Sequence, residues 1–137
     1  MPFELTIVTP EGQAYQGRVE RVVLPGREGE FGVLTNHERF LAPLRVGAVE
    51  ILTEEGPLYA AVADGFAEVD GERVTVLVDS CELEHEIDAA RADAAVEAAQ
   101  QYLEKVAGDD NPQRYQQFET ALERARTRVA VSQRKRQ

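Results

Sequence analysis

The sequence predicts an α+β protein that is mainly β in its N-terminal half, with an antiparallel β-sandwich followed by a C-terminal antiparallel two-helix hairpin. Apolar and polar residues alternate with a period of two through much of residues 1–85, as in half-buried strands. Residues 87–107 contain neither glycine nor proline and are rich in alanine, which favours a helix. A second stretch with helical spacing follows. We therefore expect a β-sandwich domain over 1–85 and a helical hairpin over 86–137.

Short runs separated by turn residues define the expected strands. The apolar residues of the first two runs are Phe3, Leu5, Ile7, Val19, Val22 and Leu24. Further strands are expected at 48–53, 58–63, 66–69 and 73–79. Gly56, Gly65 and Gly71 are expected to supply positive φ angles in tight connections, and an Asp-Gly pair between strands favours a type I′ hairpin. This spacing of strands predicts an antiparallel sandwich or barrel.

The two expected helices each carry an apolar stripe with spacings of three and four residues. In the first helix the stripe consists of Ala92, Ala95, Ala99, Tyr102 and Val106. Residues 108–112 then combine a glycine helix stop with a proline suited to the first turn of a new helix. In the second helix the stripe consists of Tyr115, Phe118, Leu122, Ala125 and Val129. Two such stripes predict an antiparallel pair of helices.

The charge of the chain is unevenly distributed. Residues 1–110 carry 8 basic and 23 acidic side chains, a net charge of −15, whereas residues 111–137 carry 7 and 2, a net charge of +5. The basic tail can attract polyanions or acidic protein surfaces. The apolar runs are far shorter than a bilayer span of about 20 residues, and the N-terminus lacks the pattern of a secretory signal. We expect a cytoplasmic protein without a membrane-spanning segment.

The residue inventory argues against a free-standing enzyme. The serines are Ser80 and Ser132, the cysteine is Cys81, and the histidines are His37 and His85, which leaves few ways to pair a nucleophile with a base. A phosphate-binding loop of the G-x-x-x-x-G-K-[ST] type is absent from the sequence. We expect no catalytic residues and no catalytic activity of the chain itself.

The residues fit two other classes, a zinc protein and a non-catalytic adaptor, less well. Cys81 and His85 lie four apart with Glu82, Glu84 and Glu86 between them, but no second Cys or His cluster completes a zinc site, so no metal is expected. A non-catalytic adaptor could use the basic C-terminal helix to bind acidic partners or nucleic acid. Nucleic-acid binding is disfavoured because no aromatic residue after Phe118 is available to stack on bases.

Several strings resemble a known family. Glu28-Gly29-Glu30-Phe31-Gly32-Val33-Leu34, with His37 three residues on, resembles the loop signature of the epsilon subunits of bacterial and chloroplast F-type ATP synthases. The strings at 7–12, 65–69, 74–77 and 87–92 occur in family order, so the resemblance covers the whole chain. It implies a β-sandwich followed by a helical hairpin, which agrees with the periodicity.

The resemblance implies a central-stalk subunit that couples rotation of the membrane c-ring to the catalytic head. The implied partners are the gamma subunit, the c-ring and, when the helices extend, the alpha and beta subunits, with membrane association only through the complex. The implied location is the cytoplasmic face of the plasma membrane, and the coupling ion is a proton or sodium. Glu30 and His37 match positions that meet the c-ring and gamma.

The resemblance also implies a regulatory role for the hairpin. Ile87-Asp88-x-x-Arg91-Ala92 resembles a motif with which some epsilon subunits bind ATP. Glu82, Arg124 and Arg128 match an adenine-contacting acid and two phosphate-binding arginines, whereas Ala98 stands where some members have a further basic residue. No cofactor is expected to be required, and ATP is implied as a regulatory ligand without dependence on a metal.

The basic C-terminal helix is implied to inhibit ATP hydrolysis when it extends beside gamma. Its positive residues would then face acidic segments of the catalytic beta subunits. The residues concerned are Arg124, Arg126, Arg128, Arg134, Lys135 and Arg136.

Overall fold

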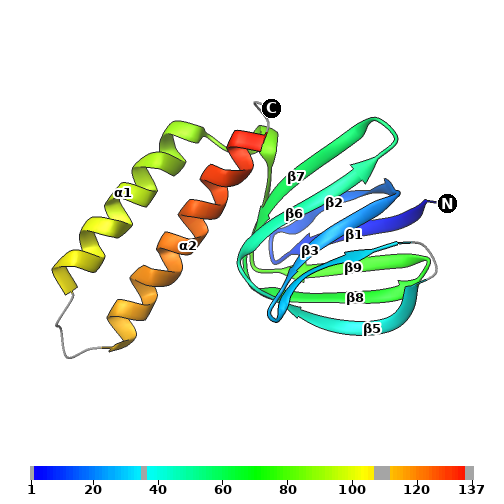
Figure 1. Ribbon diagram of the computed structural model, residues 1–137, viewed down its shortest axis with the longest axis horizontal. Helices are drawn as coiled ribbons and strands as arrows, with labels where there is room; N and C mark the ends of the chain where they lie inside the picture. Colours follow the sequence, from blue (N-terminus) through cyan, green and yellow to red (C-terminus); the bar gives the residue numbers. More distant parts are fainter. Residues whose placement is uncertain (1, 35–36, 107–111, 135–137) are drawn as a thin grey trace.

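The structure is a computed structural model that describes residues 2–34, 37–106 and 112–134. The described chain begins with a sheet-forming part and ends with two helices (Figure 1). The strands are β1 (Phe3–Thr9), β2 (Gly12–Val19), β3 (Arg21–Gly26), β4 (Gly29–Val33), β5 (His37–Leu44), β6 (Gly47–Thr53), β7 (Gly56–Val62), β8 (Gly65–Gly71), β9 (Arg73–Val78) and β10 (Cys81–Leu83). A 3₁₀ turn η1 (Glu84–Glu86) leads to α1 (Ala89–Val106) and α2 (Pro112–Arg134).

The strands form one continuous hydrogen-bonded path that folds over to make a sandwich. Its order is β10-β7-β6-β3-β5-β8-β9-β1-β2, with β4 paired to β3 off this path. The pairs are antiparallel apart from β1 with β9, which is parallel. Strands that are distant along the path meet in a single core: Leu5 of β1, Ile51 of β6 and Val76 of β9 are all fully buried in it. The predicted β-sandwich followed by a helical hairpin is therefore confirmed.

The predicted strand runs are present, but β2, β4, β5 and β10 were not predicted. Val19 and Val22, expected in one run, lie in β2 and β3 on either side of Glu20. The segment 28–37, interpreted as a loop, is largely strand, because β4 pairs back onto β3 with Gly26 opposite Gly29. Gly29 has φ of 135°, which suits the tight connection between these strands. Glycine-rich composition concealed this hairpin, since it weakens the alternation that marks a strand.

Gly65 has a different role from the one predicted. Gly56 and Gly71 have positive φ angles of 120° and 43°, as expected, but the φ angle of Gly65 is not positive. β7 and β8 are also not partners in the sheet, so Asp64-Gly65 is not a hairpin turn. A Cβ atom on Gly65 would lie 1.9 Å from the backbone oxygen of Leu77. The residue must be glycine because the β9 backbone passes too close for any side chain.

The two helices form the predicted antiparallel hairpin. α1 begins at Ala89, two residues later than expected. The rings of Tyr102 and Phe118 stack with centroids 4.8 Å apart and planes 3° from parallel. Leu122 and Ala125 of the second stripe are buried. The hairpin is therefore held by apolar contacts along the predicted stripes, while the connection over 107–111 lies outside the described residues.

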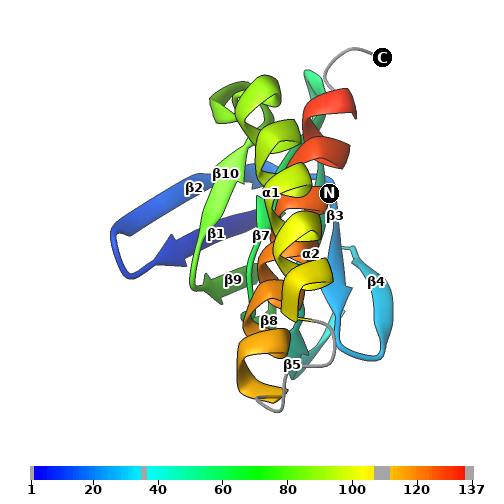
Figure 2. The ribbon, with the colours of Figure 1, turned by 90° about the vertical axis from the view of Figure 1, so that its left-hand side faces the viewer.

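α2 is the helix next to the sandwich. In Figure 1 it lies between α1 and the strands, and in Figure 2 the hairpin stands in front of the sandwich with α1 towards the viewer. α2 contacts β7 and β6. Alternation along β7 explains this: Ala60 and Val62 belong to the sandwich core, whereas Tyr59 and Ala61 contact the hairpin. β7 thus separates two apolar clusters.

Candidate functional site

The last two turns of α2 carry the residues that hold the hairpin on the sandwich. Arg128, Val131 and Arg134, spaced three residues apart, will be called the docking stripe. Val131 is fully buried in a cluster with Ala61, Ile87 and Ala92, which will be called the docking cluster. The Arg134 guanidinium lies 5.4 Å from the ring centroid of Tyr59, which is cation–π geometry.

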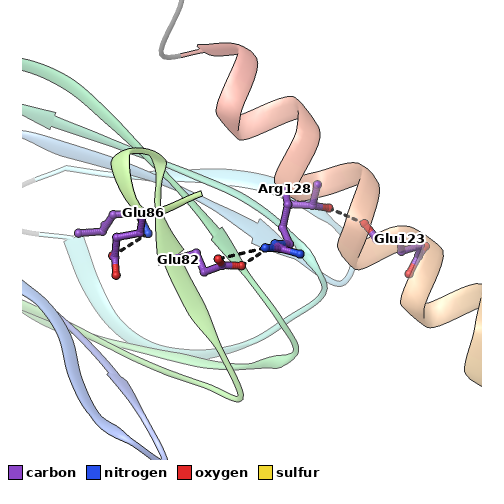
Figure 3. Close-up of polar contacts among 6 residues, drawn as sticks. Glu82, Glu86, Glu123 and Arg128 are labelled. Carbon is purple, nitrogen blue, oxygen red and sulfur yellow. Dashed lines mark hydrogen bonds and ion pairs between the residues drawn. The ribbon is translucent and has the colours of Figure 1, made fainter. Parts of the chain in front are cut away.

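Arg128 supplies an ion pair to β10. Its Nε atom lies 2.6 Å from Oε1 of Glu82, and its Nη2 donates to Oε2 at 3.4 Å (Figure 3). The two side chains are 29% and 36% exposed. Although 2.6 Å is within hydrogen-bond distance, the buried Nε has no hydrogen-bond partner, so this contact is an ion pair rather than an aligned hydrogen bond. Exposed ion pairs contribute about 0 to 1 kcal/mol, and partial burial strengthens the attraction.

A cavity of about 570 Å³ opens between α2, α1 and the sandwich beside this ion pair. That volume is within the usual range for small-molecule sites. Apolar lining comes from residues 61–63 and from Ala95, Ala121 and Ala125. The polar side chains that line it include those of Ser80, Glu82, Gln117, Thr120, Arg124 and Arg128. Two arginines together with hydroxyl and amide groups suit an anionic ligand with further polar groups, because guanidinium forks match phosphate oxygens.

The predicted nucleotide-binding residues fall into two groups. Glu82, Arg124 and Arg128 line the cavity, although the first and the last are paired with each other. The four residues of the 87–92 motif are not among its lining. Ile87 and Ala92 are members of the docking cluster, with 9% and 0% exposure.

The polar residues of the same motif lie at the start of α1. Asp88 Oδ1 accepts a hydrogen bond from the backbone N–H of Arg91 at 3.1 Å, which caps the helix. Arg91 itself is exposed. This motif therefore forms the beginning of α1 and its contact with β7.

The residues predicted to form a basic helix point in different directions. Arg126 lines a groove of about 480 Å³ between the two helices, opposite Asp93 and Glu97 of α1. Arg124 and Arg128 face the sandwich side, and Arg134 lies on Tyr59. Lys135 and Arg136 lie outside the described residues.

The sandwich has an apolar patch on its outer surface, formed by Leu41, Phe66 and Leu77. These residues are 66%, 48% and 50% exposed and lie on the neighbouring strands β5, β8 and β9. Phe66 is directly opposite Leu77 in the antiparallel register. Large apolar residues gathered on one face often mark a protein contact. Of the predicted contact residues, Glu30 is exposed on β4 and His37 is the first residue of β5.

The cysteine is poorly suited to bind metal or act as a nucleophile. Burial, with smaller contributions from the nearby charges of Glu86 and Glu82, raises the pKa of the Cys81 thiol from its ordinary value of 9.0 to about 11. Within the described residues, no group of three or more His, Cys, Asp or Glu side chains is placed to hold a metal ion.

The docking contacts of the sandwich were missed at the level of sequence. The sequence predicts a strand at 58–63 but no contact of Tyr59 or Ala61 with a helix. The predicted apolar stripe of the second helix does not include Val131. A signal was available, because residues 58–63 are apolar without interruption. A strand with both faces buried shows such a run.

Comparisons with known proteins agree with this architecture. Residues 2–84 match the family described as "ATP synthase, Delta/Epsilon chain, beta-sandwich domain", and residues 85–133 match "ATP synthase, Delta/Epsilon chain, long alpha-helix domain". The fold and the docked hairpin thus define the class: a delta/epsilon chain of an ATP synthase. Over the described residues, no helix has the length and apolar character needed to cross a membrane.

Similar proteins restrict this class to the epsilon chains. An ATP synthase epsilon chain of Synechococcus sp. (strain WH7803) is 35% identical over 132 residues, covering 96% of this chain and 97% of the relative. One of Staphylococcus aureus (strain JH9) is 39% identical over 132 residues, with 96% of both chains covered. The chain belongs to the epsilon subunit family of F-type ATP synthases.

Two solved structures share the fold. A chain of the Euglena gracilis mitochondrial ATP synthase, in a structure of OSCP, F1 and the c-ring, matches with a TM-score of 0.80 and 26% identity over 95% of this chain and 81% of that chain. A chain from the central stalk and c-ring of the Tetrahymena thermophila mitochondrial enzyme matches with a TM-score of 0.61 and 14% identity, covering 96% and 97%. The second likeness shows the fold alone.

Proposed function

We propose that this chain works in the central stalk, where its sandwich joins the gamma subunit to the c-ring and its hairpin regulates ATP hydrolysis. In this proposal the chain has no catalytic activity of its own. Residues 1–85 act as the coupling domain and residues 86–137 as the regulatory domain. The complex would place the chain at the cytoplasmic face of the plasma membrane.

The observation that carries the regulatory part is the small contact between hairpin and sandwich. It is built from a cluster of four buried residues, a partly exposed ion pair and a cation–π contact. A contact made of so few groups is compatible with folded-down and extended hairpins whose free energies differ by a few kcal/mol. Extension would free Arg128 and Arg134 from the sandwich and present them to acidic surfaces of the catalytic beta subunits.

The cavity supports ATP as the ligand that favours the folded-down hairpin. A ligand shifts an equilibrium by its difference in affinity for the two states. The cavity exists between α2 and the sandwich, so it is complete only when the hairpin is down. Arg124 and Arg128 would bind the phosphate groups, and no metal is needed for that contact. The motif residues Ile87, Asp88, Arg91 and Ala92 would take part only after rearrangement of the docking cluster.

Calorimetric titration of the purified chain with ATP tests the nucleotide site. Arg124→Ala and Arg128→Ala should weaken binding at least tenfold, since a charge-assisted hydrogen bond contributes about 1.5 to 3 kcal/mol. Arg126→Ala is the matched control, because this arginine lies between the other two in sequence but lines the groove on the α1 side. Equal loss in all three variants would show that only overall charge matters.

Removal of residues 86–137 tests the inhibitory role in the assembled complex. Assembly and coupling should persist while ATP hydrolysis rises, because the sandwich core does not use the helices. An assembled complex with unchanged hydrolysis would contradict inhibition by the hairpin.

The exposed surfaces of the sandwich support the coupling role. The apolar patch offers buried area for affinity to a protein partner, and the exposed Glu30 offers a charge for orientation. We expect Phe66→Ser to weaken gamma binding, and Glu30→Gln together with His37→Ala to weaken coupling. Gel filtration with purified gamma and ion-pumping measurements on membranes report these two effects separately. Normal gamma binding by Phe66→Ser would exclude the apolar patch as the contact.

A further inference from the structure

The sandwich holds α2 near its C-terminal end. The docking stripe touches β7 and β10, whereas Gln117, Thr120 and Ala121 of the preceding turns line the open cavity. Opening of the hairpin from the sandwich therefore has to break the contacts of the docking stripe. Arg128 is the residue of this stripe that lies next to the cavity. The residue that opposes Arg128 has a direct influence on this step.

Glu82 is presented to Arg128 by a fixed backbone. It lies at the centre of β10, directly opposite Ala61 of β7. The end of this strand is tied to η1, because Glu86 Oε1 accepts a hydrogen bond from the backbone N–H of Leu83 at 3.1 Å (Figure 3). Ala61 itself belongs to the docking cluster. The carboxylate and the apolar contact thus come from two directly paired residues on the neighbouring strands β10 and β7.

We propose that Glu82 is a latch that holds the hairpin down when no ligand is present, through its ion pair with Arg128. The buried Nε of Arg128 has the Glu82 carboxylate as its compensating charge, so loss of that carboxylate leaves a partly buried cation without its counter-charge. The chain relieves this by moving α2 into solvent. The folded-down hairpin is then an intrinsic state of the chain and does not require nucleotide.

The latch also has a consequence for the cavity. A phosphate group that binds Arg128 must compete with Glu82 for the guanidinium, since both are acceptors for the same donors. This consequence depends on nucleotide binding, whereas the latch rests only on the part of the proposed function in which the hairpin has folded-down and extended states. The test is therefore made without nucleotide.

The experiment measures the distance between α2 and the sandwich in the full chain. Spin labels are placed at Gln13→Cys and Gln116→Cys, both exposed positions, in a Cys81→Ala background. Double electron–electron resonance then gives the ratio of extended to folded-down molecules. Glu82→Gln and Arg128→Gln should each raise this ratio about 2- to 5-fold, as expected for a partly exposed pair. Glu123→Gln, an exposed carboxylate on α2, is the control and should leave it unchanged.

The double variant separates a latch from two independent effects. If the residues act through each other, Glu82→Gln combined with Arg128→Gln opens the hairpin no more than the stronger single change. The charge swap of Glu82→Arg with Arg128→Glu should restore the folded-down population. Additive effects, or a wild-type ratio in either single variant, overturn the latch. Thermal unfolding of each variant confirms that the sandwich is intact.

Discussion

Ala92→Leu should separate the hairpin from the sandwich without damaging the sandwich core. Ala92 is fully buried in the docking cluster with Ala61, Ile87 and Val131, where α1, α2 and β7 meet. Leucine adds three carbon atoms at a position with no solvent exposure. Because the sandwich core is a separate cluster behind β7, the strain is expected to fall on the hairpin contact alone.

The size of the effect follows from the packing. Extra methylene groups in a well-packed site typically cost about 1 to 3 kcal/mol. The cluster has four buried members, so few neighbours can move to accommodate the change. If the whole cost falls on docking, the ratio of extended to folded-down hairpins rises roughly 5- to 150-fold.

Hydrogen–deuterium exchange measures this release. Peptides from residues 122–134 should exchange faster, because α2 loses tertiary support and frays more often. Peptides from β1 and β9 should exchange at the wild-type rate, since their core is untouched. Ala98→Leu is the matched control: it is the same substitution on the same helix at an exposed position.

Two results would refute this reasoning. Equal exchange of α2 in Ala92→Leu and Ala98→Leu would mean that the docking cluster has room for a larger side chain. Faster exchange throughout β1 and β9 would mean that the two clusters are not independent.

Three further predictions concern the rest of the molecule. Gly65→Ala should lower the melting temperature by at least about 10 °C, because its Cβ atom would overlap the β9 backbone. Gly32→Ala is the control: this position has open space around it, so the variant should melt within about 2 °C of wild type. Alkylation of Cys81 should reach half its maximal rate near pH 11 in the folded chain and near pH 9 in urea, and equal midpoints would contradict a buried thiol. Phe118→Ala removes the stacking on Tyr102 and should destabilise the outer part of the hairpin by about 0.5 to 1.5 kcal/mol in addition to the loss of burial. Hydrogen–deuterium exchange in residues 112–121 should then be faster. Unchanged exchange would mean that the stacked rings contribute nothing.

The raised pKa of Cys81 also fixes how stability changes with pH. Between pH 9.0 and about 11 the unfolded chain loses the thiol proton while the folded chain keeps it. The unfolded state therefore binds fewer protons, and stability falls as pH rises through this range. Chemical denaturation of Cys81→Ala should show a smaller fall over the same range, and an identical fall would assign it to other groups.

Much of the fold could be predicted from period and composition. Alternation identified the strands with a clear inner face, and the spacing of three and four identified both helices. The strands that were missed are those with weak alternation, such as β4 with its glycines and the three-residue β10. Gly65 shows a second limit: the sequence marks it as a turn residue, but its reason lies in a backbone approach from β9. A contact between strands distant in sequence leaves no local signal.

In the candidate site, too, some features follow from the sequence and others depend on the tertiary structure. The motifs and their order along the chain were sufficient to predict the family and the two-part fold, and they singled out Glu82, Arg124 and Arg128. Tertiary structure decided that Glu82 and Arg128 face each other, and that Ile87 and Ala92 are covered by β7 and α2. Glu82 and Arg128 are 46 positions apart in the sequence. Only the packing of the hairpin on the sandwich brings them within an ion-pair distance. Side-chain identity fixes what a residue can bind, whereas the folded arrangement fixes which partner it meets.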